Sequence, residues 1–251
     1  MFAIRKRLAV GISITSAMAL MVSAVAAGDY RQVNFPVENC INLGSGLESP
    51  EEGQWGYNIK QEHFGIIRAK GFDTVRIPVK WTKWVPEGVW QPTYNPSPLS
   101  HFNRSLSQAP YTINPAFLSR VDEVISWAMQ AGLKVVVNVH HFDELEIEPA
   151  NPATYNNQEK RLIAIWKQLG EHYRNMPSGL MFEIINEPKG QFQGEYLNRT
   201  QLAALAEIRK TNPTRTVILT GDQTGGVPGI DNLRLPPNDL NVVASVHSYT
   251  P

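Results

Sequence analysis

The stretch LMFEIINEPKG, residues 180–190, decides the fold class of this chain. Its first part, residues 180–185, is a nearly continuous apolar run, which is typical of a strand in a parallel sheet that is covered on both faces. Asn186, Glu187 and Pro188 follow at once and end the run. The stretch therefore predicts a buried parallel strand with polar side chains directly after it.

Further runs of β-branched and apolar residues predict more strands, and helical patterns lie between them. The predicted strands are residues 37–43, 74–79, 134–140, 180–185, 216–220 and 242–247, and the predicted helices are residues 58–70, 114–131, 156–175 and 200–211. Such alternation is typical of right-handed βαβ units around a parallel sheet. The fold class is therefore α/β, either an open doubly wound sheet or a (β/α)₈ TIM barrel.

The residues after the strands favour the barrel. No G-x-G-x-x-G or G-x-x-x-x-G-K-[ST] pattern follows any strand, so the usual nucleotide-binding signature of open sheets is missing. Polar and aromatic residues occupy these positions instead, and in a barrel they converge on one mouth. Six βα units can be counted rather than eight, so a barrel built from them alone would be incomplete.

Composition excludes several other classes. The 251 residues carry 23 basic and 23 acidic side chains, so the chain has no excess of positive charge for binding nucleic acid. Hydrophobic residues make up 42% of the chain, which is too many for a disordered protein. Cys40 is the only cysteine, so a disulfide framework and a cysteine-based zinc site are excluded. We expect a monomer without a nucleic-acid partner.

The first 27 residues have the three parts of a secretory signal peptide. Basic residues 5–7 precede an apolar run over residues 8–21, and small residues follow at 23, 24, 26 and 27. A membrane anchor is the alternative, but the run is shorter than the ~20 residues that span a bilayer. The sequence therefore predicts a signal peptide over residues 1–27, a mature domain over 28–251, and a secreted or periplasmic protein that leaves the membrane after cleavage.

Glu187 is the first candidate for chemistry at the strand ends. A carboxylate just after a buried strand is partly desolvated, which raises its pKa and suits it to general acid catalysis. Asn186 beside it can donate a hydrogen bond to a substrate hydroxyl. The ends of the other predicted strands carry Asn42, Glu48, Arg76, His140, His141, His247 and Tyr249.

Each of these residues also has a simpler explanation. Asn-Glu-Pro can be a solvated turn, a histidine at a strand end can be a packing group, and Arg76 can pair with a buried carboxylate. The recurrence of polar residues at all these strand ends nevertheless favours a shared site.

Together these motifs resemble one family. NLGSGLE at residues 42–48, WG at Trp55, GFDTVRIPVKW at 71–81, VVVNVHH at 135–141, FEIINEP at 182–188 and VHSYTP at 246–251 resemble glycoside hydrolase family 5, specifically its cellulase-like endo-β-1,4-glucanases. The resemblance runs from about residue 36 to the last residue. It implies a (β/α)₈ catalytic domain that hydrolyses β-1,4-glucan within the chain, with retention and without a metal or other cofactor.

The resemblance also implies roles for single residues. Glu187 would be the acid/base, with a raised pKa, and Asn186 would hold the sugar 2-hydroxyl and the nucleophile. Arg76 would keep the nucleophilic carboxylate ionised. The remaining strand-end residues would line the reacting subsite or its neighbour: His140, His141, His247, Tyr249, Asn42 and Glu48.

Aromatic residues in the loops after the first two strands predict a platform for sugar rings, whose apolar faces pack on indole and phenol rings. This platform would comprise Trp55, Trp81, Trp84, Trp90 and Tyr94. Trp127 and Trp166 lie within predicted helices at core spacing, which favours packing for both.

The chain departs from the family at one point. The family places its nucleophilic glutamate on strand seven and a tryptophan on strand eight, and this sequence matches neither. We therefore expect a C-terminally truncated fragment that is inactive by itself.

Three alternatives stay open. The chain could be a β-mannanase or xyloglucanase of the same family, or a carbohydrate-binding relic without catalysis. It could also be a metal-dependent barrel hydrolase with His140, His141, Asp143 and His247 as ligands. This last alternative is disfavoured because adjacent histidines on a regular strand point to opposite faces.

Overall fold

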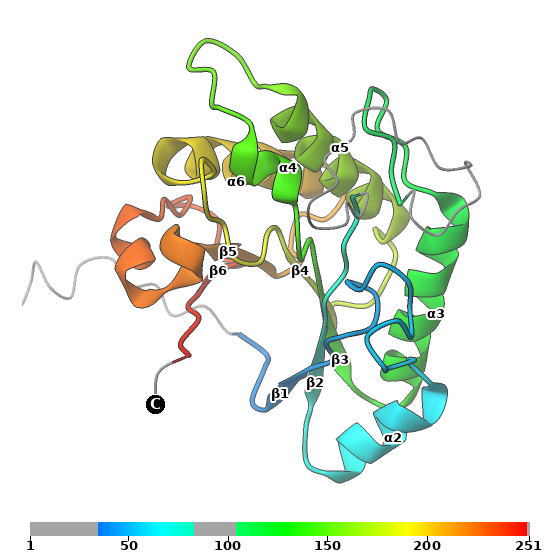
Figure 1. The fold of residues 1–251 in the computed structure, drawn as a ribbon. Helices are drawn as coiled ribbons and strands as arrows, with labels where there is room; N and C mark the ends of the chain where they lie inside the picture. Colours follow the sequence, from blue (N-terminus) through cyan, green and yellow to red (C-terminus); the bar gives the residue numbers. More distant parts are fainter. Residues whose placement is uncertain (1–34, 83–103, 250–251) are drawn as a thin grey trace, which may run out of the picture. The chain divides into compact units, whose positions relative to one another are not determined.

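The computed structural model describes residues 35–82 and 104–249, and six strands of this part form one parallel sheet (Figure 1). The strands are β1 Cys40–Asn42, β2 Thr74–Ile77, β3 Lys134–Asn138, β4 Leu180–Glu183, β5 Val217–Thr220 and β6 Val242–Ser245. Their order in the sheet is their order in the sequence, and every neighbouring pair is parallel. A doubly wound sheet would reverse its order around the first strand. The structure therefore confirms the α/β class and the incomplete barrel.

Helices connect these strands, and all four predicted helices are present. The helices are α2 Gln61–Ala69, α3 Pro115–Gln130, α4 Asp143–Ile147, α5 Asn157–His172, α6 Gly194–Arg209, and the 3₁₀ helices η1 Gln223–Gly225 and η2 Val227–Asn232. Helix α6 begins earlier than the predicted residue 200, because Tyr196 and Leu197 in its first turn are buried in the core. The short elements α4, η1 and η2 were not predicted, since so few residues show no periodicity.

Asparagine side chains begin the two long helices that follow β2 and β3. The Asn114 side chain accepts a hydrogen bond from the backbone N–H of Ala116 (2.9 Å), and Pro115 is the first helical residue. Asn156 and Glu159 form a reciprocal capping box at α5. These side chains satisfy N–H groups that would otherwise lack partners at the start of each helix.

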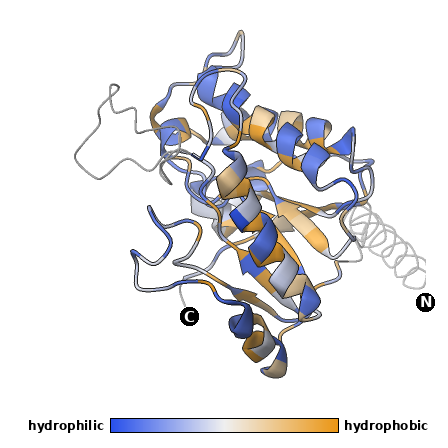
Figure 2. Cartoon of the chain, turned by 90° about the vertical axis from the view of Figure 1, so that its right-hand side faces the viewer, coloured by the Kyte–Doolittle hydropathy of each residue, from blue (hydrophilic) through white to orange (hydrophobic). Residues whose placement is uncertain are grey.

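The helices are amphipathic and bury their apolar residues in one large core that they share with the sheet (Figure 2). Trp166 of α5 is fully buried there, and its indole N–H donates to the carbonyl of Ile184 (2.9 Å). Trp127 is partly buried against the same core. The predicted packing role of both tryptophans is confirmed.

Strand residues alternate between two faces of the sheet. Val135 and Phe182 belong to the core shared with the helices, whereas Val136 and Met181 belong to a separate small cluster on the inner face. This alternation follows from the period of two residues in a strand. The inner face is therefore lined separately from the helix-packed core.

The register of the strands brings polar residues together on this inner face. Asn42 lies opposite Arg76, and Asn138 lies opposite Glu183. These positions lie toward the C-terminal ends of the strands, where barrel enzymes build their sites.

Some predictions fall outside the described residues. These are the signal peptide over residues 1–27 and the loop aromatics Trp84, Trp90 and Tyr94. Within residues 35–82 and 104–249, no helix has the length and apolar character needed to cross a membrane.

Candidate active site

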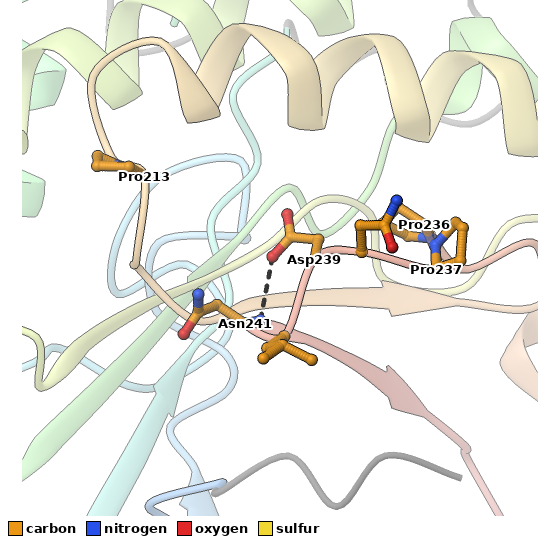
Figure 3. A pocket seen from close by; sticks show the side chains of 7 residues that line it. Pro213, Pro236, Pro237, Asp239 and Asn241 are labelled. Atoms are coloured by element: carbon orange, nitrogen blue, oxygen red, sulfur yellow. Dashed lines mark hydrogen bonds between the residues drawn. The ribbon is translucent and has the colours of Figure 1, made fainter. Parts of the chain in front are cut away.

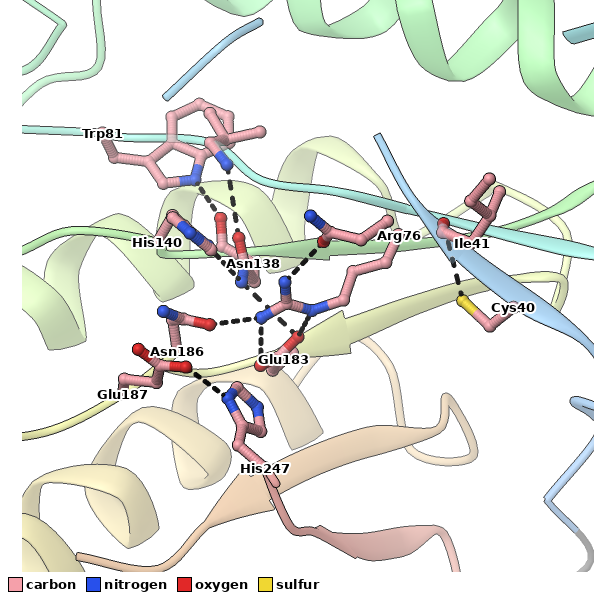
Figure 4. Close-up of polar contacts among 12 residues, drawn as sticks. Cys40, Ile41, Arg76, Trp81, Asn138, His140, Glu183, Asn186, Glu187 and His247 are labelled. Carbon is pink, nitrogen blue, oxygen red and sulfur yellow. Dashed lines mark hydrogen bonds and ion pairs between the residues drawn. The ribbon is translucent and has the colours of Figure 1, made fainter. Parts of the chain in front are cut away.

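Arg76 of β2 is the centre of a hydrogen-bond network on the inner face (Figure 4). Its guanidinium donates two bonds to the Glu183 carboxylate, from Nε to Oε2 (2.6 Å) and from Nη2 to Oε1 (2.8 Å). It also donates to Oδ1 of Asn42 (2.7 Å) and to Oδ1 of Asn186 (2.6 Å). The Glu183 side chain is 2% exposed and that of Arg76 17%, so this is a largely buried ion pair.

This geometry supports the simpler explanation considered for Arg76, a buried carboxylate partner. Sequence reasoning missed Glu183 because it lies inside a run that is otherwise apolar. A charged residue within a buried strand must be paired, and that rule could have singled it out.

Arg76 also fixes the orientation of the Asn186 amide. A guanidinium can only donate hydrogen bonds, so the atom of Asn186 that faces Arg76 must be the carbonyl oxygen. The amide nitrogen then points elsewhere and can donate to a ligand. Asn186 is 4% exposed, which limits its freedom to rotate.

Glu187 lies beyond β4 and is held from the end of β6 (Figure 4). Nδ1 of His247 lies 2.7 Å from its Oε1, and the Tyr249 hydroxyl donates to the same oxygen. The structure thus brings Glu187 together with two predicted site residues that lie 60 and 62 positions further along the sequence.

The pKa of Glu187 is lowered, which corrects the predicted raised value. Burial raises the pKa, but hydrogen bonds from Tyr249 and His247 and the positive charges of His247 and Arg76 outweigh it. A carboxyl group keeps a raised pKa when it is buried without donors or near a second free carboxylate. Here Glu187 has donors, and Glu183 is neutralised by Arg76.

His140 and His141 lie side by side after β3. Their ring centroids are 4.5 Å apart and the rings are nearly perpendicular. The predicted strand over residues 134–140 is too long: β3 ends at Asn138, so the alternation that would point the two histidines to opposite faces does not extend to them. Burial lowers the pKa of both histidines. The charges of His141 and Arg76 lower the pKa of His140 further, and the charge of Lys80 lowers that of His141 further.

The proposed metal ligands are not arranged as a metal site. Asp143 instead forms an ion pair with Nζ of Lys80 (2.6 Å). Across the two described ranges, no group of three or more His, Cys, Asp or Glu side chains is placed to hold a metal ion.

Two predicted sugar contacts need correction. Trp81 is fully buried, and its indole N–H donates to the backbone carbonyl of Asn138 (2.8 Å), so it belongs to the core and not to a cleft. Glu48 is 4% exposed, and its carboxylate accepts hydrogen bonds from the backbone N–H groups of Ser45 and Gly46. It closes its own turn and does not reach outward to a sugar. Trp55 is 43% exposed, and its contact with sugar stays a prediction.

The loop after β5 connects the segment that carries Glu187 with the segment that carries His247. The backbone N–H of Thr224 donates to the carbonyl of Pro188 (2.9 Å), directly after Glu187, and the N–H of His247 donates to the carbonyl of Gly225 (2.8 Å). Gly221 allows this loop to fold tightly, since a Cβ there would lie 2.3 Å from the carbonyl oxygen of Gly229. Sequence reasoning missed the loop, although its four glycines within nine residues, 221–229, were a visible signal.

A hollow of about 530 Å³ lies away from this site (Figure 3). Pro213, before β5, and residues 236–241, before β6, line it, so it opens at the opposite end of these strands. Its Asp239 carboxylate accepts hydrogen bonds from Arg209 (2.6 Å) and from the backbone of Asn241 (3.0 Å). The hollow is therefore separate from the polar strand ends.

A parallel half-barrel that gathers a glutamate, an amide and histidines at its C-terminal strand ends is typical of TIM-barrel enzymes. The sequence model of the family Cellulase (glycosyl hydrolase family 5) matches residues 36–251, and the chain belongs to this family. The family resemblance predicted from the motifs is confirmed.

Curated relatives and solved structures agree with this family. Endoglucanase H of Acetivibrio thermocellus is 33% identical over 84% of this chain and 20% of its own length, and the cellulase/esterase CelE of that organism is 29% identical over 84% and 25%. A structure of Thermotoga maritima Cel5A in complex with cellobiose has a TM-score of 0.72 at 34% identity, covering 86% of this chain and 65% of its own. Another Cel5A structure contains mannotriose. The chain thus spans less than two thirds of each of these relatives.

Proposed function

We propose that the strand-end site binds a β-1,4-glucan and that Glu187 is the acid/base of its endo-acting hydrolysis. One observation carries the proposal. Arg76 donates a hydrogen bond to Oδ1 of Asn186 (2.6 Å), and the neighbouring Glu187 is held by His247, whose Nδ1 lies 2.7 Å from its Oε1. This arrangement presents one carboxyl group and one amide donor together, as cleavage next to a sugar hydroxyl requires. Membership of the cellulase family supports the substrate class.

The proposed reaction is a retaining double displacement. A second carboxylate about 5–5.5 Å away would raise the pKa of Glu187, which the described residues by themselves lower, and so let Glu187 hold a proton. The protonated Glu187 gives its proton to the glycosidic oxygen, while the second carboxylate bonds to the anomeric carbon and the leaving sugar departs. Water then attacks that carbon, Glu187 takes the proton of the water, and the bond between enzyme and sugar breaks.

Glu183 is poorly suited to be the second carboxylate. Both of its oxygens accept bonds from Arg76, and its side chain is 2% exposed. We therefore propose that Glu183 is not the nucleophile, and that the chain binds glucan without hydrolysing it unless a strand-seven carboxylate, as the family resemblance implies, completes the site.

Binding and turnover can be tested separately. Calorimetry with cello-oligosaccharides should detect binding by the chain, and Asn186→Ala should weaken it. Release of reducing ends from a soluble β-glucan should be absent for this chain but present for a version extended by two further βα units. In the extended version, Glu187→Gln should lower the rate at least about a hundredfold, whereas the exposed control Glu62→Gln should leave it unchanged. Comparable hydrolysis by the chain and by the extended version would overturn the proposal that the chain binds glucan without hydrolysing it.

Mannan is a second candidate substrate, because a structure of the related Cel5A contains mannotriose. Parallel assays with β-glucan, β-mannan and xyloglucan would rank the three polysaccharides. Binding without turnover in every version would instead favour a carbohydrate-binding relic.

We also propose that residues 1–27 direct export and are then removed. The basic residues, apolar run and small residues of this segment support the proposal. Mass spectrometry of the exported protein should find an N-terminus near Ala27 or Gly28; an intact Met1 would contradict it.

A further inference from the structure

Asn138, the last residue of β3, makes three polar contacts with its side chain (Figure 4). Its Oδ1 accepts a hydrogen bond from the backbone N–H of Val79 (3.2 Å). Its Nδ2 lies 3.5 Å from Oε2 of Glu183 and 3.2 Å from Nδ1 of His140. The residue is fully buried, so these contacts do not compete with solvent.

Two of these contacts fix the orientation of the amide. The N–H of Val79 can only donate, and the Glu183 carboxylate, ion-paired with Arg76, accepts. A flipped amide would place its NH₂ group against the N–H of Val79 and its oxygen against the carboxylate. Both contacts would then be repulsive, so the NH₂ group faces Glu183 and His140.

The orientation of the amide decides the protonation of His140. Since Nδ1 of the imidazole faces a donor, it must act as an acceptor and carries no proton. Burial, together with the charges of His141 and Arg76, lowers the pKa of His140, so the ring is neutral near pH 7. A neutral imidazole with an unprotonated Nδ1 carries its proton on Nε2.

We propose that Asn138 is a positioning residue that holds His140 in the Nε2–H form, so that His140 donates a hydrogen bond to an oxygen of the ligand. Asn186 presents a second donor, because Arg76 engages its oxygen. Both groups thus suit a ligand rich in acceptor oxygens, such as a sugar. The choice of sugar rests on the proposed function, whereas the position of the proton does not.

The position of the proton can be observed directly by NMR. Long-range ¹H–¹⁵N correlation spectra of the chain with ¹⁵N-labelled histidine separate Nδ1–H, Nε2–H and doubly protonated rings. The chain has six histidines, so the signals of His140 are assigned by their loss in His140→Gln. At pH 7 and without ligand, His140 should be protonated on Nε2 alone. A proton on Nδ1 in the unmodified chain would overturn the proposal, whatever the variants do.

Asn138→Asp tests whether Asn138 is the cause. A carboxylate keeps the acceptor for Val79 but can only accept at His140, so the proton should move to Nδ1 or a second proton should be bound. Asn175→Asp adds the same charge at an exposed position and should leave the spectrum of His140 unchanged. An Nε2–H form that persists in Asn138→Asp would show that other groups fix it and would overturn the proposal.

Ligand binding provides an independent readout. Asn138→Asp should bind cello-oligosaccharides about tenfold more weakly, the expected loss of one hydrogen bond, while Asn175→Asp should bind as the unmodified chain does. If the proton of His140 moves in Asn138→Asp and the affinity for cello-oligosaccharides equals that of the unmodified chain, the proposed hydrogen bond from His140 to the ligand is overturned. If the tautomer is as expected and the unmodified chain binds no oligosaccharide, the proposed substrate is wrong and the assignment of the proton stands.

Discussion

Glu183→Gln is the substitution that tests the network around Arg76 most directly. Gln keeps the size of the side chain but removes the charge and one of the two acceptor oxygens. The Arg76 guanidinium, whose side chain is 17% exposed, would remain largely buried without the carboxylate to which it donates two hydrogen bonds. Removing one partner of a buried ion pair costs about 3–5 kcal/mol. Because Arg76 keeps some contact with solvent, we expect a loss near the lower end, about 3 kcal/mol.

Urea unfolding followed by circular dichroism measures this loss as a change in the free energy of unfolding. In thermal unfolding, the same loss corresponds to a decrease in Tm of about 6–12 °C for a domain of this size. Glu171→Gln is the matched control, since Glu171 pairs with Arg174 at the exposed C-terminal end of α5. It should cost less than about 1 kcal/mol.

A double substitution separates the ion pair from the packing of its side chains. Arg76→Met combined with Glu183→Leu removes both charges, so it should be more stable than Glu183→Gln alone. A loss from Glu183→Gln no larger than that from Glu171→Gln would refute the argument that this pair is buried and coupled.

Two further substitutions test the loop and the carboxylate of the site. Gly221→Ala should destabilise the protein by about 1–3 kcal/mol, because its Cβ would lie 2.3 Å from the carbonyl oxygen of Gly229. The control Gly65→Ala in α2, with open space around its Cβ, should stabilise the protein by about 0.5–1 kcal/mol. Equal effects of the two substitutions in urea unfolding would contradict this account. Tyr249→Phe should raise the pKa of Glu187, because it removes a donor to the ionised carboxylate, and ¹³C NMR titration of the carboxyl group should detect the rise. The associated loss of stability should be present above the ordinary pKa of 4.5 and disappear as the pH falls through the lowered pKa; an unchanged titration would contradict the assigned cause.

The sequence alone determined the class of fold and singled out Glu187 as the candidate carboxylate of the site. Apolar runs and helical periodicity depend on burial and backbone preference within a short segment, so they can be recognised without the rest of the chain. All six strands were predicted for this reason. Glu187 was found because it follows a strand whose apolar run is easily recognised.

Only the tertiary structure decided which groups work together. Glu183 and Arg76 are 107 positions apart, and their contact depends on the register of three strands. The end of β3 at Asn138 lets His140 and His141 lie together, against the alternation that a longer strand would impose. Partners, burial and pKa values are properties of the space between elements, and no local pattern in the sequence encodes that space.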